Sequence, residues 1–298
     1  MLLLITGSAD GTADRLVDRI GEGVFRLNYD LWSDYDFFIQ ESGWEIRNPA
    51  GLKITSETVT CAYWWKAFSY FVDNQDKFVV AEVKYIFREL YGWCVTRGLT
   101  KGNSIDFHNT YGKMNIQSLA RHHFKTSPAL VTFNLYGSDL LKDAEVVTKS
   151  LASVPMNDKS VLHTTPVKLD ALHPKYPWFL QKKIDSAWDV TVFYCNGKTF
   201  GFRRSREDLE GLDWRAEQDF HYTEQEWFPI DLDREFTSGI NSLSDDLNVE
   251  FGRYDFMINE HNEMIFLEFN ANGQWVFLDI KDEYGLLDCV ASWLSPQD

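Results

Sequence analysis

The sequence is short of basic residues. Lys and Arg together number 29, against 45 Asp and Glu, which gives a formal net charge of −16. Because affinity for DNA and RNA depends largely on cationic side chains that neutralise phosphates, this balance argues against a nucleic-acid partner. A protein of this charge that handles a phosphorylated ligand must gather a few Lys, Arg or metal ions inside a local site.

Cysteines and long apolar runs are also scarce. The four cysteines, Cys61, Cys94, Cys195 and Cys289, form no CxxC pair or Cys/His cluster with zinc spacing, which favours reduced structural thiols. The amino-terminal apolar run, 2–5, lacks a basic segment before it and is too short to be a signal peptide or a membrane span. We expect a cytoplasmic protein without a membrane segment.

The usual phosphate-binding motifs are missing as well. Gly7 and Gly11 follow the first strand-like segment, but there is no GxGxxG and no Walker Lys-Ser/Thr pair. A nucleotide-binding loop at this position is therefore disfavoured. Five histidines show no metal-ligand spacing, and we expect them to be polar surface or packing residues: His108, His122, His123, His163 and His173.

Apolar and aromatic residues are abundant, at 44% and 15% of 298 residues. This length and composition predict a globular chain of two or three compact units. We expect an amino-terminal α/β domain over 1–108, a small central domain over 109–180 and a carboxyl-terminal domain over 181–298. In the first domain the residue pattern predicts strands at 2–5, 24–28, 37–44 and 59–65, a helix ending at residue 20 and a long helix over 74–97.

The rest of the chain favours a mixed α/β fold. In the central domain we expect a helix at 115–124, strands at 129–133 and ending at Lys149, and a long loop or lid at 153–177 that carries four prolines. An antiparallel sheet is predicted from the segments 178–184, 190–195, 198–204, 253–258 and 264–269. Helices are expected at 238–247 and 286–294.

The strongest functional signal lies in a hairpin near the carboxyl end. Side chains of a strand alternate between faces, so Glu268 and Asn270 should point the same way. A turn centred on His261 and Asn262 would place Asp255 directly opposite Glu268. Facing carboxylates repel each other, and the oxygen ligands of Asp, Glu and Asn suit Mg²⁺. The local pattern alone leaves a solvent-facing polar edge equally open.

These residues resemble a known family. Asp255 followed by the segment 266–275, Phe-Leu-Glu-Phe-Asn-Ala-Asn-Gly-Gln-Trp, is similar to the metal-binding end of ATP-grasp ligases. The Asn-x-x-Gly-Gln-Trp ending more narrowly resembles the graspetide, or microviridin-type, maturases that crosslink ribosomal peptides. Four further segments resemble this subgroup in the same order along the chain: Cys61–Lys66, Thr148–Ser150, Gln181–Ile184 with Asp189, and Asp213-Trp214-Arg215.

The resemblance implies an ATP-grasp fold that binds ATP and two Mg²⁺ ions. It implies the following site residues: Asp255, Glu268 and Asn270 on the metal, Lys149 on the phosphates, Gln181, Lys182, Lys183 and Ile184 around adenine, Asp189 near the ribose, and Asp213 and Arg215 near the reacting groups. From the strands alone, Asp189 would lie opposite Arg204, and a simple cross-strand ion pair explains it equally well. Without the resemblance, Lys149 would be a solvated residue at a strand end.

The implied reaction activates a side-chain carboxylate of a precursor peptide as an acyl phosphate and joins it to a hydroxyl or amine, closing an ester or amide ring. The implied partners are that peptide, docked through its leader segment, and a second copy of the chain in a homodimer. Two alternatives remain open: a ligase acting on free amino acids or a protein terminus, and a non-catalytic ATP-binding module. The sequence departs from the family at Thr191, where an Arg is usual, and at Ala271, where a Pro is usual.

Overall fold

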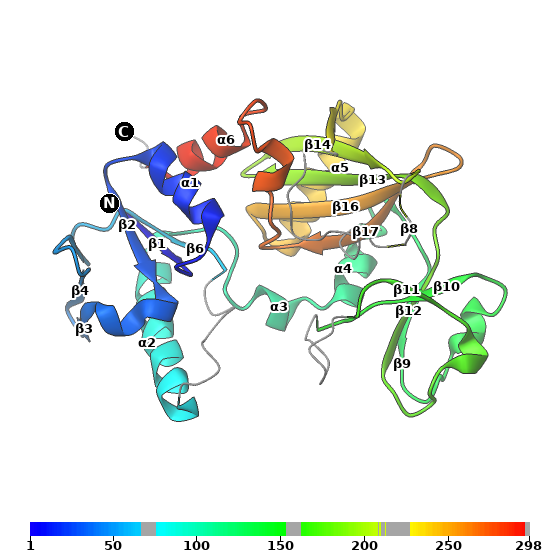
Figure 1. The fold of residues 1–298 in the computed structure, drawn as a ribbon, viewed down its shortest axis with the longest axis horizontal. Helices are drawn as coiled ribbons and strands as arrows, with labels where there is room; N and C mark the ends of the chain where they lie inside the picture. Colours follow the sequence, from blue (N-terminus) through cyan, green and yellow to red (C-terminus); the bar gives the residue numbers. More distant parts are fainter. Residues whose placement is uncertain (67–75, 153–161, 208, 210–211, 213–226, 296–298) are drawn as a thin grey trace. The chain divides into compact units, whose positions relative to one another are not determined.

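The computed structural model describes residues 1–66, 76–152, 162–207, 209, 212 and 227–295, which Figure 1 draws in colour. The chain divides into two compact units, Met1–Ile105 with Gln274–Asp298, and Asp106–Gly273. None of the described helices has the length and apolar character needed to cross a membrane.

Unit 1 is built around a parallel sheet with the strand order β2-β1-β6-β7. Strand β1 is buried along its whole length, as is usual for a central parallel strand covered on both faces. The carboxylate of Asp10 caps the first helix by accepting a hydrogen bond from Ala13 N. The elements of this layer are β1 (Leu2–Thr6), α1 (Gly11–Ile20), β2 (Val24–Asn28), η1 (Tyr29–Asp34), β6 (Cys61–Trp64), α2 (Lys77–Val95) and β7 (Thr100–Lys101).

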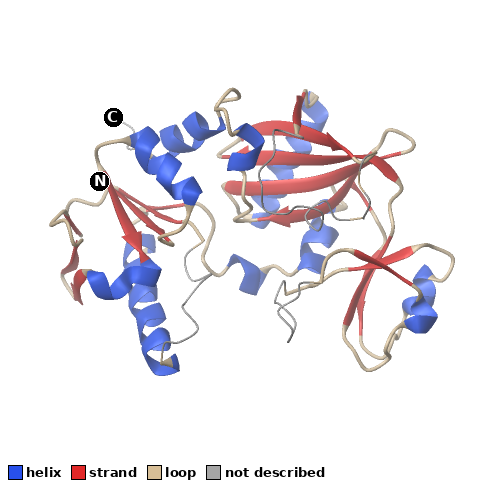
Figure 2. Ribbon diagram, viewed as in Figure 1, coloured by secondary structure: helices blue, strands red, loops and turns tan. Residues whose placement is uncertain are grey.

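A second, antiparallel sheet of unit 1 corrects one expectation. The segment 37–44, expected to be one strand, lies in a hairpin of β3 (Asp36–Gln40) and β4 (Gly43–Arg47), which β5 (Lys53–Thr55) extends. The chain reverses at Glu41 and Ser42, within the polar run Gln40-Glu41-Ser42 before Gly43, which is a turn signal that the single-strand expectation passed over. Figure 2 shows these short strands in red.

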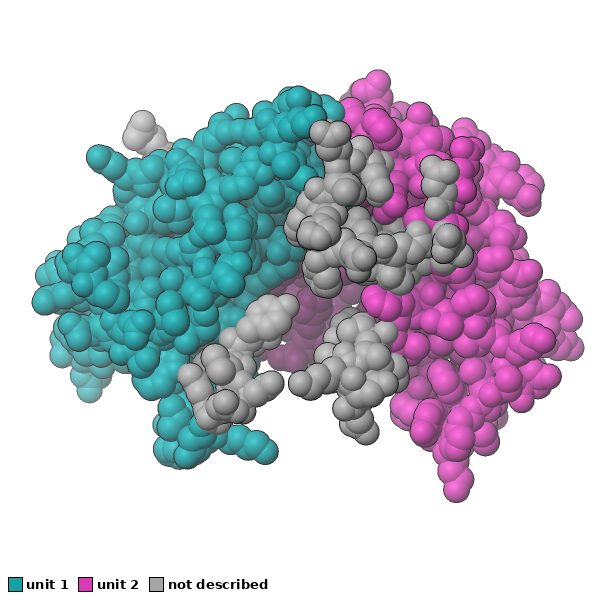
Figure 3. Space-filling view, in the orientation of Figure 1, with its two compact units in different colours: residues 1–105, 274–298 teal, residues 106–273 magenta. Residues whose placement is uncertain are grey.

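The last residues of the chain pack within unit 1. An Nη atom of Arg15 donates to the carbonyl oxygen of Ile280 at 2.9 Å, and Arg19 forms an ion pair with Asp288. The elements of this segment are η5 (Val276–Asp279) and α6 (Leu286–Leu294). Residues 274–298, which the sequence grouped with the carboxyl-terminal sheet, therefore lie with the parallel sheet (teal in Figure 3), while the expected three-part division stays a prediction.

Unit 2 contains two sheets. The larger has the order β15-β14-β13-β16-β17-β8 and is antiparallel except for β8, which runs parallel to β17. The smaller, antiparallel sheet has the order β11-β10-β12-β9. Strands of the larger sheet are β8 (Lys125–Thr126), β13 (Ser186–Cys195), β14 (Lys198–Ser205), β15 (Phe228–Ile230), β16 (Phe251–Asn259) and β17 (Met264–Asn270). Strands of the smaller sheet are β9 (Ala129–Thr132), β10 (Val146–Thr148), β11 (Thr165–Val167) and β12 (Trp178–Lys182).

Helices complete unit 2. Helices α4 and α5 contribute Ile116, Ile240 and Leu243 to one buried cluster with side chains of β13, β16 and β17. The carboxylate of Asp233 caps α5 by accepting a hydrogen bond from Phe236 N. The helical elements are α3 (Phe107–Thr110), α4 (Lys113–Ala120), η2 (Ser138–Leu141), η3 (Leu169–Ala171) and α5 (Arg234–Leu247).

Two expectations for this unit were wrong. Strand β12 (Trp178–Lys182) belongs to the smaller sheet, between β10 and β9, and not to the sheet that carries the hairpin. The predicted loop 153–177 contains β11 and η3 within its described part, 162–177. Pro166 lies on β11 at the edge of its sheet, where a missing N–H costs no ladder hydrogen bond, so its presence did not exclude a strand.

Candidate nucleotide and metal site

The hairpin of β16 and β17 places Asp255 opposite Glu268, the pair that was predicted from a turn at His261 and Asn262. The turn differs from the expected one. Asn259 N donates to Glu263 O at 3.0 Å, and Asn262 adopts a left-handed conformation with φ of 59°, so the loop has three residues and centres on His261.

A β-bulge reconciles this turn with the predicted pair. Phe256 lies opposite Phe266, whereas Asp255 lies opposite Glu268, so Leu267 is one extra residue on β17. The bulge has a packing cause, because Phe266 and Phe269 both belong to the same buried cluster although they are three residues apart. A regular strand cannot place residues of that spacing on one face.

Four donors hold the carboxylate of Asp255. Thr191 Oγ1 donates to Oδ1 at 2.8 Å, and Arg253 donates from Nε to Oδ1 at 3.0 Å and from Nη2 to Oδ2 at 3.1 Å. Asn270 Nδ2 donates to Oδ2 at 2.8 Å and to Glu268 Oε1 at 3.4 Å. Thr191, at the position where the family usually has Arg, thus holds this carboxylate.

Two lysines approach Glu268 from outside the hairpin. Lys113 Nζ, at the start of α4, lies 3.6 Å from Glu268 Oε2 and donates to the carbonyl oxygen of Ser150 at 2.8 Å. Lys149 Nζ, directly after β10, lies 3.8 Å from the same Oε2 and 5.4 Å from the ring centre of Phe179 on β12. Lys149 therefore links the end of a strand of the smaller sheet to the hairpin of the larger sheet.

The charges of this cluster show how the repulsion between the facing carboxylates of Asp255 and Glu268 is offset. Arg253, Lys113 and Lys149 outnumber Asp255 and Glu268 by one positive charge, so side chains alone can neutralise the pair. Both lysine distances exceed a normal hydrogen bond, and the surplus positive charge suits an anionic phosphate ligand.

The donor set also fits magnesium. Carboxylate and amide oxygens are ligands that Mg²⁺ accepts, and this ion is usually held by one or two carboxylates with water and nucleotide phosphates completing the shell. Among the described residues, no group of three or more His, Cys, Asp or Glu is arranged to hold a metal. A magnesium ion here would depend on Asp255, Glu268 and Asn270 together with ligands from a nucleotide.

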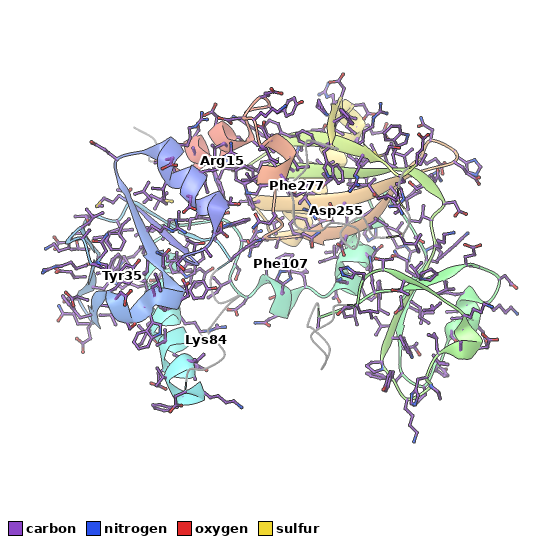
Figure 4. The ribbon with its side chains drawn as sticks, in the orientation of Figure 1. Arg15, Tyr35, Lys84, Phe107, Asp255 and Phe277 are labelled. Atoms are coloured by element: carbon purple, nitrogen blue, oxygen red, sulfur yellow. The ribbon has the colours of Figure 1, made fainter. Side chains whose placement is uncertain are left out.

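A pocket of about 660 Å³ opens over this cluster within unit 2. Lys113, Lys149, Glu268 and Asn270 are part of its wall. Figure 4 labels Asp255 on the larger sheet and Phe107 on α3. The residue that follows Phe107, His108, is part of the pocket wall. The remaining lining residues are Tyr111, Gly112, Ile116, Ser150, Leu151, Ala152, Leu162, His163, Thr164 and Phe269.

The segment Gln181–Ile184 lies at the end of β12 and is not part of the described pocket wall. Lys182 N donates to Pro128 O at 2.8 Å, Lys182 O accepts from Ser127 Oγ at 2.7 Å, and Lys183 N donates to Glu145 O at 2.8 Å. The side chain of Gln181 is buried. Within the described residues, the carbonyl of Lys183 and the N–H of Ile184 remain available to a ligand.

Asp189 is also outside the pocket wall, and its ion pair differs from the expected one. Arg204 is its cross-strand neighbour, but both carboxylate oxygens accept from Arg206 Nη1, at 2.7 and 2.8 Å. Arg206 follows β14 and also donates to Leu212 O at 3.0 Å, which fixes its guanidinium. Burial raises the pKa of Asp189, and the charge of Arg206 opposes that shift.

Two predicted residues cannot be placed. Asp213 and Arg215, expected near the reacting groups, lie outside the described residues, so their role stays a prediction. Conversely, no role was predicted for Lys113 or Arg253. Arg253 shares a strand face with Asp255 because the two are two residues apart, which was a usable signal, whereas Lys113 is brought to Glu268 only by the packing of α4.

Comparison with solved structures identifies the class of fold. No family model matches the sequence, and no curated protein matches it significantly. Solved ATP-grasp ligases do match the structure along nearly the whole chain, so the chain has the ATP-grasp fold. This confirms the mixed α/β architecture expected from the sequence.

Three solved structures illustrate the similarity. The macrocyclase MdnC bound with precursor peptide MdnA, from Microcystis aeruginosa MRC, has a TM-score of 0.80 and 19% identity and covers 99% of each chain. A RiPP-associated ATP-grasp ligase of Chryseobacterium gregarium, in complex with ADP and a leader and core peptide, has a TM-score of 0.83 and 21% identity over 99% of this chain and 97% of that one. The ATP-grasp ligase PsnB, complexed with minimal precursor, Mg and ADP, has a TM-score of 0.72 and 12% identity over 98% and 96% of the two chains.

Proposed function

We propose that this protein is an ADP-forming ligase that uses Mg-ATP to crosslink side chains of a precursor peptide. The observation that carries the proposal is the convergence of Glu268, Asn270, Lys113 and Lys149 on one pocket, with Asp255 hydrogen-bonded to Asn270. The fold supports it, because solved structures of the same fold are described as a macrocyclase and as peptide-associated ATP-grasp ligases.

The nucleotide is assigned to this pocket by charge. Lys113 and Lys149 would hold the phosphates as point charges, and Asp255, Glu268 and Asn270 would hold one or two magnesium ions. Adenine would take its backbone hydrogen bonds from the Lys183 carbonyl and the Ile184 N–H, the groups at the end of β12 that have no partner among the described residues. Asp189 would lie on the ribose side.

The chemistry would proceed in two steps. A side-chain carboxylate of the peptide attacks the γ-phosphate of ATP and forms an acyl phosphate with release of ADP. A hydroxyl or amine side chain then displaces phosphate and closes an ester or amide ring. Magnesium, when bound, would neutralise part of the negative charge of the phosphates. Lys113 and Lys149 hold the phosphates in line with the attacking group, and Arg215 with Asp213 is assigned to the reacting centre.

The partner is proposed to be a precursor peptide with a leader segment, docked so that its core reaches the pocket at high local concentration. The structure of MdnC is described with a precursor peptide, and that of the Chryseobacterium ligase with a leader and core peptide. We further propose that the working form is a homodimer in the cytoplasm.

The test uses the purified protein with a peptide encoded by a neighbouring reading frame, in which Thr, Ser or Lys alternates with Asp and Glu. With Mg-ATP the peptide should lose the mass of one water per ring, and ADP should form in equal amount. Glu268→Gln should abolish this turnover, whereas Glu260→Gln, on the exposed turn of the same hairpin, should leave it unchanged.

The outcomes separate the proposed substrate from other substrates. Release of ADP with free amino acids, without any change in peptide mass, would replace the peptide proposal by that of a small-molecule ligase. Tight ATP binding without turnover on any peptide would point to a binding module. Equal rates in Glu268→Gln and the parent protein would show that the site is misassigned.

A further inference from the structure

The short helix α3 is fixed next to the proposed magnesium ligands. Phe107 is buried, and its ring centre lies 5.6 Å from that of Phe269 in an edge-to-face arrangement. Phe269 lies between Glu268 and Asn270 on β17. Tyr111 also packs against Phe107, with ring centres 5.2 Å apart. The position of the residue after Phe107 is therefore determined by the same strand that carries the site.

That residue is His108, whose side chain is accessible and lines the pocket. The other charged or titratable side chains that line the pocket are Tyr111, Lys113, Lys149, His163 and Glu268. Burial, followed by the charge of Lys113, lowers the pKa of His108 below its usual value of 6.5. The imidazole is therefore neutral at pH 7, and one of its ring nitrogens can accept a proton.

The other pocket groups are less suited to accept a proton. An ammonium group has no acceptor, which excludes Lys113 and Lys149 in their charged forms. The carboxylate of Glu268 faces both ammonium groups and accepts from Asn270 Nδ2. Among these groups, a neutral imidazole is therefore the best acceptor for a proton that leaves a nucleophile inside the pocket.

We propose that His108 is the general base of the ring-closing step, an inference that rests on the proposed ligase function. The hydroxyl or amine of the peptide attacks the carbonyl carbon of the acyl phosphate as its proton passes to a ring nitrogen of His108. The new C–O or C–N bond forms, the bond from the carbonyl carbon to the phosphate oxygen breaks, and inorganic phosphate leaves. The proton is then released from the imidazolium to solvent.

This role predicts a separation of the two chemical steps. A carboxylate needs no base to attack the γ-phosphate, so His108→Gln should still form ADP and acyl phosphate. Hydroxylamine added to the reaction should trap that acyl phosphate as a hydroxamate on the peptide, at a rate within a few-fold of the parent protein. Ring closure, measured as loss of water from the peptide, should fall by about 100-fold or more.

The pH profile supplies a second readout. In the parent protein the rate of ring closure should rise with pH through the pKa of His108, below 6.5, and then level off. His108→Gln should lack this rise. His122→Gln, a change of the same kind at an exposed histidine, is the matched control and should keep both the rate and the profile.

Three results would overturn the proposal. One is ring closure by His108→Gln at the parent rate, and another is loss of hydroxamate and ring product together, which would indicate a role in nucleotide binding or folding. The third is selective loss of ring closure in His163→Gln with His108→Gln unaffected, which would move the base to His163. Failure of the parent protein to crosslink the peptide would instead reject the proposed function itself.

Discussion

The side chain of Gln117 on α4 donates from Nε2 to the carbonyl oxygen of Leu267, the extra residue of the bulge in β17. Gln117 is buried, so its amide satisfies a carbonyl that the irregular ladder leaves without a strand partner. The bulge in turn sets Glu268 opposite Asp255. A helix residue distant in sequence thus stabilises the geometry of the proposed metal site.

Replacing this amide should weaken both the fold and the site. In Gln117→Leu the Leu267 carbonyl loses its donor in a buried place, which should lower the free energy of unfolding by about 1–3 kcal/mol in urea titrations. Mg-ATP binding should weaken as well, because the bulge positions Glu268. Ser118→Ala, at the next and exposed position of α4, should change stability by less than about 0.5 kcal/mol. Unchanged stability and binding in Gln117→Leu would contradict this role.

Lys113 should contribute to nucleotide affinity. Its ammonium is 3.6 Å from Glu268 Oε2, and we assign it to the phosphates of ATP. Lys113→Gln removes one charge-assisted contact, so calorimetric titration should show ATP binding weakened by about 10-fold to 100-fold. The matched control is Lys125→Gln, an exposed lysine paired with Glu263 on the hairpin turn, which should bind ATP like the parent protein. Equal affinities of the two variants would remove Lys113 from the site.

The thiols should be unreactive in the folded protein. All four cysteines are reduced and buried, and burial raises the pKa of Cys94 to about 12. The thiolate is the reactive form, so raising the pH from 7 to 10 should accelerate alkylation of Cys94 in the unfolded chain but not in the folded one. Mass spectrometry after iodoacetamide treatment, with and without denaturant, measures this difference. Rapid labelling of native Cys94 near pH 8 would contradict the prediction.

Asp279 should be important for the stability of unit 1. Its carboxylate accepts from the backbone N–H of Glu283 at 2.7 Å, of Tyr284 at 3.1 and 3.2 Å, and of Leu286 at 3.1 Å. Asp279→Ala leaves these donors without their charged acceptor, which should cost about 2–4 kcal/mol of unfolding free energy. Glu283→Ala, an exposed acid in the same loop, should cost less than about 0.5 kcal/mol. Chemical denaturation of both variants provides the comparison.

Several parts of the fold were accessible from residue patterns. The first strand, the helix that ends at Ile20, the long helix α2 and the carboxyl-terminal helix α6 all lie where periodicity placed them. The hairpin β3-β4 was missed although its turn has a local signal, the exposed polar run Gln40-Glu41-Ser42 followed by Gly43. Strand β12 was assigned to the wrong sheet, since a strand pattern says which face is buried and nothing about which strand lies beside it.

The candidate site was also predicted in part. Asp255, Glu268 and Asn270 were predicted to meet, and they do, although through a three-residue turn and a bulge in place of the expected two-residue turn. The predicted phosphate lysine, Lys149, lies at Glu268. The predicted ion-pair partner of Asp189, Arg204, was wrong. The guanidinium of Arg206, which follows the end of β14, binds the carboxylate instead.

The sequence by itself determined which residues form strands and which oxygen-bearing side chains share a face. That information is local, because side-chain direction follows from a period of two along one strand. Only the tertiary structure decided that Lys113 and Lys149 face Glu268 and that Gln117 completes the bulge. These contacts join segments far apart in the chain, and their formation depends on how helices and sheets pack, for which no short stretch of sequence carries a signal.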